Sequence, residues 1–320
     1  MLFVFSLFLI CFADEKIENL YKLWGKQSGE ELYEKAEALH FTGQFIQAQV
    51  LINYMLENHF SEDVYFLWGQ NLEYRKDYSF AIDIYKQLLD EDIDPLLVLD
   101  VQYRLGIAYD DSGQPSKATK VWSRLLSDKK FPEQHRSAVE LLLGAAYIHK
   151  GQRKKGVMII TKALSRATRE QDWMKARARN ALAMVAISQA DEIKLYGSDV
   201  QKKIKQRMSL LQQAEEQVIA SVHLNKTSYV LQGVIQMVDA YLRFYDDARS
   251  IVSPVSISPK LEYRYFKELE KKSHTLLLRA ENYLEKGIQT SRRQQWKGDE
   301  TQELHERLQF VRKEKKTRRD

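Results

Sequence analysis

Small and aromatic residues recur at helical intervals between Gln102 and Leu126. The positions that set this pattern are Gly106, Tyr109, Gly113, Ala118 and Trp122. In a helical hairpin, a small residue stands where the two helices approach most closely, and an aromatic residue fills the space one turn away. Glycine suits the left-handed end of the first helix, and Pro115 suits the first turn of the second. The stretch therefore predicts two antiparallel helices that are joined by a turn at Gly113.

The same pattern occurs in three further units of the chain. The turn positions, 33, 37 and 38 residues apart, are Gly43, Lys76, Gly113 and Gly151. Lys76 stands where the other units have glycine, and Gly156 replaces the alanine in the fourth unit. The four units lie between residues 30 and 166 and resemble tetratricopeptide (TPR) repeats, which have a period of about 34 residues. The resemblance implies an all-α fold, a right-handed solenoid of helical hairpins.

The repeat pattern weakens after residue 166, but the sequence remains helical in character. Residues 167–298 predict a degenerate TPR-like region with long amphipathic helices near 199–223, 229–251 and 260–296. Two prolines and four serines fall within Ser250–Pro259, which is predicted to be free of helix. Residues 14–29 predict a lead-in helix before the repeats, and residues 299–320 form a charged, basic tail.

The first thirteen residues are apolar except for Ser6. This pattern is typical of the hydrophobic part of a signal sequence, although a positive segment before it is missing. A transmembrane helix needs about 20 apolar residues, so the run predicts cleavage between Ala13 and Asp14. We therefore expect export to the periplasm or cell envelope. Lipidation at Cys11 is less favoured because Ile10 stands where lipoprotein signals have a small residue.

The alternative is that the apolar run is retained. In that case the chain is a cytosolic or membrane-tethered TPR adaptor or regulator, and residues 1–13 act as its anchor.

The composition supports a helical chain with its own core. Hydrophobic residues make up 44% of the 320 residues, with only 13 glycines and 5 prolines. Abundant Leu, Ala, Glu, Lys and Gln favour helix because these side chains lose little rotamer freedom in it. The net charge of the whole chain is +5. The last 61 residues carry 17 Lys and Arg against 11 Asp and Glu, a local charge of +6, so the remainder of the chain is close to neutral. A single cysteine excludes a disulfide within the chain.

No sequence motif with a catalytic mechanism is present. The seven histidines lack a second histidine or a cysteine at metal-ligand spacing, and no phosphate-binding glycine loop or nucleophile motif occurs. Adjacent acidic residues such as Asp110 and Asp111 are interpreted as solvated faces or helix ends, because neighbours on a helix point in different directions. We therefore expect a non-enzymatic protein without cofactor or metal.

The TPR resemblance implies a groove that receives a peptide segment of a partner protein. Helical phase gives four candidate groove residues, which are Lys35, Glu73, Arg104 and His149. The lysine and asparagine clamp by which some TPR proteins bind a chaperone carboxylate is not present, since Tyr33 and Glu37 occupy the equivalent positions. The sequence thus predicts a protein-binding scaffold in a bacterial envelope assembly, such as motility or secretion machinery, without identifying the partner.

The basic tail has three interpretations. Its cations are Arg312, Lys313, Lys315, Lys316, Arg318 and Arg319. A solvated end is the first interpretation, and binding to an anionic membrane or polymer is the second. Nucleic acid comes last, because no aromatic residue interrupts the run for base stacking.

Overall fold

The computed structural model describes residues 20–129, 131–197, 199–224, 226–251 and 259–316. Within these ranges the chain consists of helices and turns, and no strand occurs among them. Consecutive helices pack as antiparallel pairs, so the all-α prediction is confirmed. The chain divides into a unit of residues 1–101 and a unit of residues 102–320, which we describe separately.

The first unit contains two helical hairpins. Its helices are α2 (Gly29–Phe41), α3 (Phe45–Asn58), α4 (Glu62–Tyr74) and α5 (Tyr78–Asp90). A capping box begins α2, in which the Ser28 side chain accepts from the Glu31 amide and the Glu31 side chain accepts from the Ser28 amide. Apolar side chains on the facing sides of the helices are fully buried, including Leu32, Leu51 and Ile52. This core holds the two hairpins together.

The predicted turn positions share one backbone geometry. Gly43, Gly113 and Gly151 have φ values of 78°, 76° and 85°, and Lys76 adopts the same left-handed region with φ of 66°. In each turn, the next residue's amide donates to a carbonyl five residues earlier, as Gln44 does to Leu39. This is the Schellman motif, which ends a helix and satisfies its last carbonyls. The lysine in the second turn therefore follows the glycine pattern without glycine's freedom.

The second unit begins within α6 (Pro95–Asp111), which is followed by α7 (Pro115–Ser127), α8 (Glu133–His149) and α9 (Arg153–Leu164). Gly106 lies against the indole of Trp122, and a Cβ atom there would overlap the ring. At the α8–α9 crossing, a Cβ on Gly156 would lie only 2.5 Å from the Gly144 carbonyl oxygen. The small residues of the repeat pattern thus mark close helix contacts, and the crossing at Gly156 leaves no room even for alanine.

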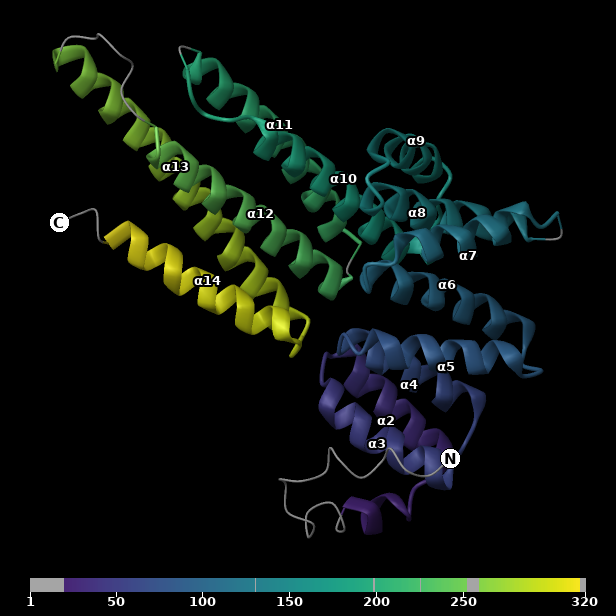
Figure 1. Cartoon of the computed structure of the whole chain (residues 1–320). Coiled ribbons are helices and arrows are strands. Elements are labelled where there is room, and N and C mark those ends of the chain that lie inside the picture. Colours follow the sequence, from purple (N-terminus) through teal and green to yellow (C-terminus); the bar gives the residue numbers. More distant parts are fainter. Residues whose placement is uncertain (1–19, 130, 198, 225, 252–258, 317–320) are drawn as a thin grey trace. The chain divides into compact units, whose positions relative to one another are not determined.

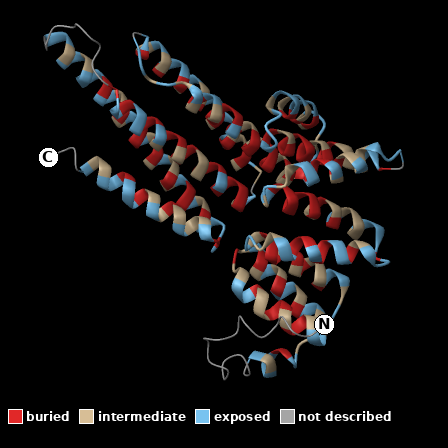
Figure 2. Ribbon diagram, in the orientation of Figure 1, coloured by how far each residue is buried: buried red, intermediate tan, exposed pale blue. Residues whose placement is uncertain are grey.

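Longer helices follow in the same unit (Figure 1). They are α10 (Asp172–Glu192), after the short 3₁₀ helix η1 (Arg169–Gln171), then α11 (Val200–Val222), α12 (Thr227–Arg249), α13 (Pro259–Arg293) and α14 (Asp299–Lys316). Each helix from α10 to α13 contacts the next, and α14 packs on both α12 and α13. Buried residues lie along the sides of these helices that face their neighbours (Figure 2).

The C-terminal helices differ from the prediction in two details. Helix α13 ends at Arg293 instead of near Trp296, because Gln295 has a positive φ of 52° and Trp296 folds back into a buried position. The apolar stripe of Leu304, Leu308 and Val311 is buried, so residues 299–316, predicted only as a charged tail, form the packed helix α14. Most of the predicted helix-free segment, residues 252–258, lies outside the described residues.

Candidate functional site

Two of the candidate groove residues, Lys35 and Glu73, lie in the first unit. Lys35 is exposed on α2. Glu73 is only 6% exposed, and the Tyr85 hydroxyl donates to its carboxylate at 3.0 Å. Glu73 therefore joins α4 to α5 from the inside of a hairpin, and its burial corrects the expectation of a groove-facing side chain. Helical phase missed this because it places a side chain on a face without showing which helix covers that face.

The other two, Arg104 and His149, lie in the second unit and both contact other helices. The guanidinium carbon of Arg104 is 5.2 Å from the centre of the Trp173 ring, a cation–π contact between α6 and α10. His149 Nδ1 is 2.8 Å from Oδ2 of Asp110. An ionised carboxylate can only accept, so the Nδ1–H of His149 is the donor. Both residues are engaged within the chain, and partner binding by them stays a prediction.

Asp110 is the centre of a buried polar cluster between α6, α8 and α10. Its side chain is fully buried, and Arg177 donates to it at 2.7 Å and to Asp111 at 2.6 Å. Burial by itself raises the pKa of Asp110, but hydrogen bonds and charges from His149 and Arg177 outweigh it and lower the pKa below its ordinary value. The sequence interpretation of this acidic pair as solvated is wrong for Asp110, because its partners are 39 and 67 residues away.

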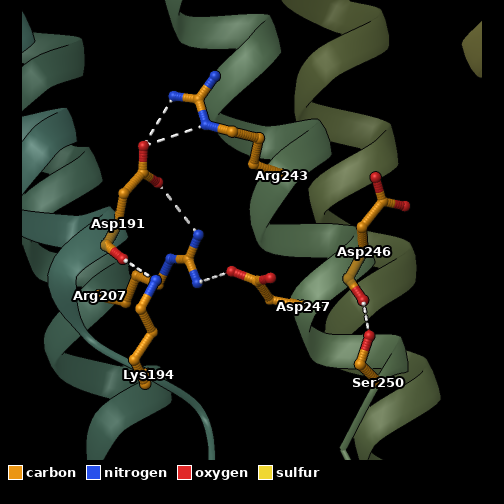
Figure 3. Close-up of polar contacts among 7 residues, drawn as sticks. All are labelled: Asp191, Lys194, Arg207, Arg243, Asp246, Asp247 and Ser250. Carbon is orange, nitrogen blue, oxygen red and sulfur yellow. Dashed lines mark hydrogen bonds and ion pairs between the residues drawn. The ribbon is translucent and has the colours of Figure 1, made fainter.

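A second buried cation, Arg207, joins α10, α11 and α12. Its side chain is 1% exposed, pairs with Asp191 and Asp247, and lies with its guanidinium carbon 4.6 Å from the centre of the Phe244 ring. Arg243 adds a second ion pair to Asp191 at 2.9 Å. Figure 3 shows the ion pairs of Arg207 with Asp191 and Asp247 and that of Arg243 with Asp191. It also shows the neighbouring hydrogen bonds of Lys194 and Ser250 to main-chain carbonyls. The two clusters tie α10 to its neighbouring helices, and the buried charges in both clusters are paired between helices.

Residues of α11, α12 and α13 line an open cleft. It encloses about 680 Å³. Helix α11 contributes the face that runs from Glu215 through Ile219 to His223, just after the helix, and α12 contributes Val230 and Val234. Helix α13 contributes positions from Arg279 to Arg293 at helical spacing. The volume is within the range of about 300 to 1,000 Å³ that is typical of ligand sites in proteins.

One end of the cleft is held by a hydrogen-bonded network across the three helices. The Tyr241 hydroxyl of α12 donates to Glu215 of α11, and Arg279 of α13 lies 3.3 Å from both Glu215 oxygens. Burial raises the pKa of Tyr241 and of Tyr283 above the ordinary value, and the charge of Glu215 raises both further. Both phenols are therefore neutral at physiological pH. The network fixes the separation of the two walls at this end of the cleft.

The rest of the cleft has an apolar wall and a basic wall. Ile219 is 51% exposed on the α11 side, next to the buried Val218. On the α13 side, Lys286 and Arg293 make no ion pair with any carboxylate in the described part of the chain. Three permanent cations, Arg279, Lys286 and Arg293, face the single carboxylate Glu215, so the lining carries a net charge of +2 (3 − 1) with His223 neutral.

The basic tail is partly neutralised by α13. Arg312 lies 3.2 Å from Glu281 and 2.8 Å from Glu285, and Lys315 also pairs with Glu281. Burial raises the pKa of Glu281, but bonds from Lys315 and Arg312 outweigh it and lower that pKa. Lys313 and Lys316 lie on exposed positions of α14. Four other predicted positions, Ala13, Asp14, Arg318 and Arg319, lie outside the described residues, as does Cys11.

The ion pairs of Arg177, Arg207 and Arg312 join side chains of different helices. No group of three or more histidine, cysteine, aspartate or glutamate side chains that could hold a metal occurs in the described ranges. Across the same ranges, no helix combines the length and apolarity that crossing a bilayer requires. The chain matches no model of a known protein family, and a search of curated proteins likewise finds no match.

Proposed function

We propose that this chain is a non-enzymatic scaffold of helical pairs that binds a segment of a partner protein in the α11–α13 cleft. The observation that carries the proposal is the open cleft itself, which places the half-exposed Ile219 opposite two cations without an ion-pair partner among the described residues. Exposed apolar area that adjoins unpaired charge is typical of a protein-binding surface. The Arg177 and Arg207 clusters support the proposal because they hold the long helices of this unit together.

The dimensions favour a peptide segment over a small molecule. Arg279 and Arg293 are fourteen residues apart on α13, which corresponds to about 21 Å at about 1.5 Å per residue. The cleft is lined along this length by helix faces at spacings of three and four residues. A groove of this kind suits the helix-in-groove mode of recognition, in which an amphipathic helix lays one face between two others.

We also propose that the helical pairs form a TPR-type right-handed solenoid, which the shared Schellman turns support. We further propose that the chain is located in a bacterial envelope assembly such as motility or secretion machinery. The envelope location rests on the apolar sequence of residues 1–13 alone. The alternative is a cytosolic or membrane-tethered adaptor. N-terminal sequencing of the mature protein distinguishes the two, since a start at Asp14 supports export and retention of Met1 supports the adaptor.

The binding proposal is tested by site-specific photo-crosslinking in native cells. A photoreactive amino acid replaces Ile219 in the full chain, and the matched control replaces Gln213, an exposed residue on the same helix that does not line the cleft. We expect a discrete crosslinked protein from position 219 and none from position 213. Equal crosslinking from both positions, or no crosslink from position 219, would show that the cleft is not the binding site.

A further inference from the structure

We infer that the segment bound in the α11–α13 cleft is an acidic amphipathic helix, with its apolar side on Ile219 and its carboxylates on Lys286 and Arg293. This inference rests on the proposed function and specifies the chemistry of the partner.

The cations on α13 and α14 differ in whether a carboxylate pairs with them. Arg279 has Glu215 as a partner, and Arg312 and Lys315 have Glu281. Lys286 and Arg293 line the cleft, and no carboxylate of the described ranges pairs with them. Cations that share a concave site reinforce each other's field and attract a ligand of opposite charge. The cleft therefore selects against basic segments and favours acidic ones.

The spacing of the two cations suggests the form of the ligand. Lys286 and Arg293 are seven residues apart, which puts them on one face of α13, two turns and about 10.5 Å apart. A partner helix that lies along α13 presents carboxylates at the same separation when they are also seven residues apart. An acidic side chain every second turn of one helix thus matches both cations at once.

The opposite wall requires the ligand to be apolar as well. Ile219 is half exposed, and Val222 follows it on the same face of α11. Val230 and Val234 of α12 add further apolar lining. Covering Ile219 removes apolar surface from water, which a purely acidic polymer cannot do. A helix with an apolar stripe beside an acidic stripe satisfies the two walls together, whereas nucleic acid or a polyanion satisfies only one.

The test uses the purified full chain and synthetic peptides of about eighteen residues, measured by fluorescence anisotropy. One peptide carries leucines at spacings of three and four residues and glutamates seven residues apart. The second has glutamine for every glutamate, and the third keeps the glutamates but has serine for every leucine. We expect the first peptide to bind about tenfold more tightly than either of the others, and to weaken as salt is raised.

Two variants of the protein separate the specific effect of the cleft from general charge. Lys286→Glu with Arg293→Glu reverses the basic wall, and Lys271→Glu with Arg292→Glu makes the same charge change at exposed positions of α13 that do not line the cleft. We expect the first pair to weaken the acidic peptide about tenfold or more, and the control pair to change binding less than about threefold. Circular dichroism checks that both variants retain the helical content of the parent.

Several results would overturn the inference. The glutamine peptide binding as tightly as the glutamate peptide would remove the role of charge, and the serine peptide doing so would remove the role of the apolar wall. Equal losses in both variants would move the site elsewhere, and anionic vesicles that bind through Lys286 and Arg293 in preference to the peptide would identify a membrane ligand. A crosslinked partner at Ile219 combined with any of these results would leave the proposed function standing while refuting its acidic partner.

Discussion

Replacing Arg177 with methionine tests whether the Asp110 cluster holds α6, α8 and α10 together. In the native chain the guanidinium makes hydrogen bonds of 2.7 Å to Asp110 and of 3.1 and 2.6 Å to Asp111. Methionine fills the space with an apolar side chain of similar length, but it leaves Asp110 with His149 as its only remaining side-chain partner among the described residues. Asp110 Oδ1 already has no hydrogen-bond partner there, so the carboxylate becomes a poorly compensated buried charge.

The expected loss in free energy of unfolding for Arg177→Met follows from the burial of Asp110. Removing one partner of a buried ion pair destabilises a protein by about 3 to 5 kcal/mol. Asp111 is 31% exposed and recovers water, so its contribution is small. His149 can still donate to Asp110, which places the prediction at about 3 kcal/mol, the low end of that range. Combining Arg177→Met with Asp110→Asn removes the buried charge, and should recover about half of the loss.

The assay is urea unfolding followed by circular dichroism. The matched control is Arg153→Met, which removes an ion pair to Glu192 in which both side chains are 40% or more exposed. The control should cost less than about 1 kcal/mol, because water replaces an exposed pair. If Arg177→Met costs no more than Arg153→Met, or if adding Asp110→Asn destabilises the chain further, the buried charge of Asp110 does not depend on Arg177 for its compensation.

Two further predictions follow from particular side chains. Lys76→Gly should raise the free energy of unfolding of the first unit by about 0.5 to 1 kcal/mol, because a lysine with φ of 66° bears a left-handed strain that glycine does not. Thermal melts check this prediction, with Gly43→Lys as the comparison, which should lower the free energy of unfolding. Lowering the pH should destabilise the second unit through Asp110, whose folded-state pKa lies below the ordinary value of an aspartate. The contribution of this carboxylate is complete above the unfolded pKa, and is lost as the pH falls through the folded pKa. Urea midpoints at about pH 3 and pH 6 should therefore differ less in Asp110→Asn than in the parent, and an equal difference would contradict the assignment.

The turns and close helix contacts of the hairpins were predictable from the sequence. The turn positions were found from spacing alone, including Lys76, because a Schellman turn depends on a few neighbouring residues. The close approach at Gly106 was also predicted, since only a small residue tolerates a facing indole at that distance. The long amphipathic helices near 199–223, 229–251 and 260–296 were predicted for a similar reason, because each carries its buried face in its own period.

The candidate site was much less predictable. Helical phase assigned Glu73 to a groove, but the neighbouring helix buries it against Tyr85. The basic tail was interpreted as a free charged end, whereas Arg312 and Lys315 pair with α13. In both cases the deciding contact comes from another helix, and sequence periodicity contains no information on which helix that is.

The sequence by itself determined where helices begin, turn and present an apolar face, because those properties depend on residues within a few positions of one another. Only the tertiary structure decided which charged side chains form ion pairs within the described part of the chain and which do not. Asp110 and Arg177 are 67 residues apart, and Arg207 and Asp247 are 40 apart. Ile219 and Lys286 likewise line one cleft from separate helices. Their juxtaposition depends on the packing of long helices side by side, and so on the side chains of the whole unit at once.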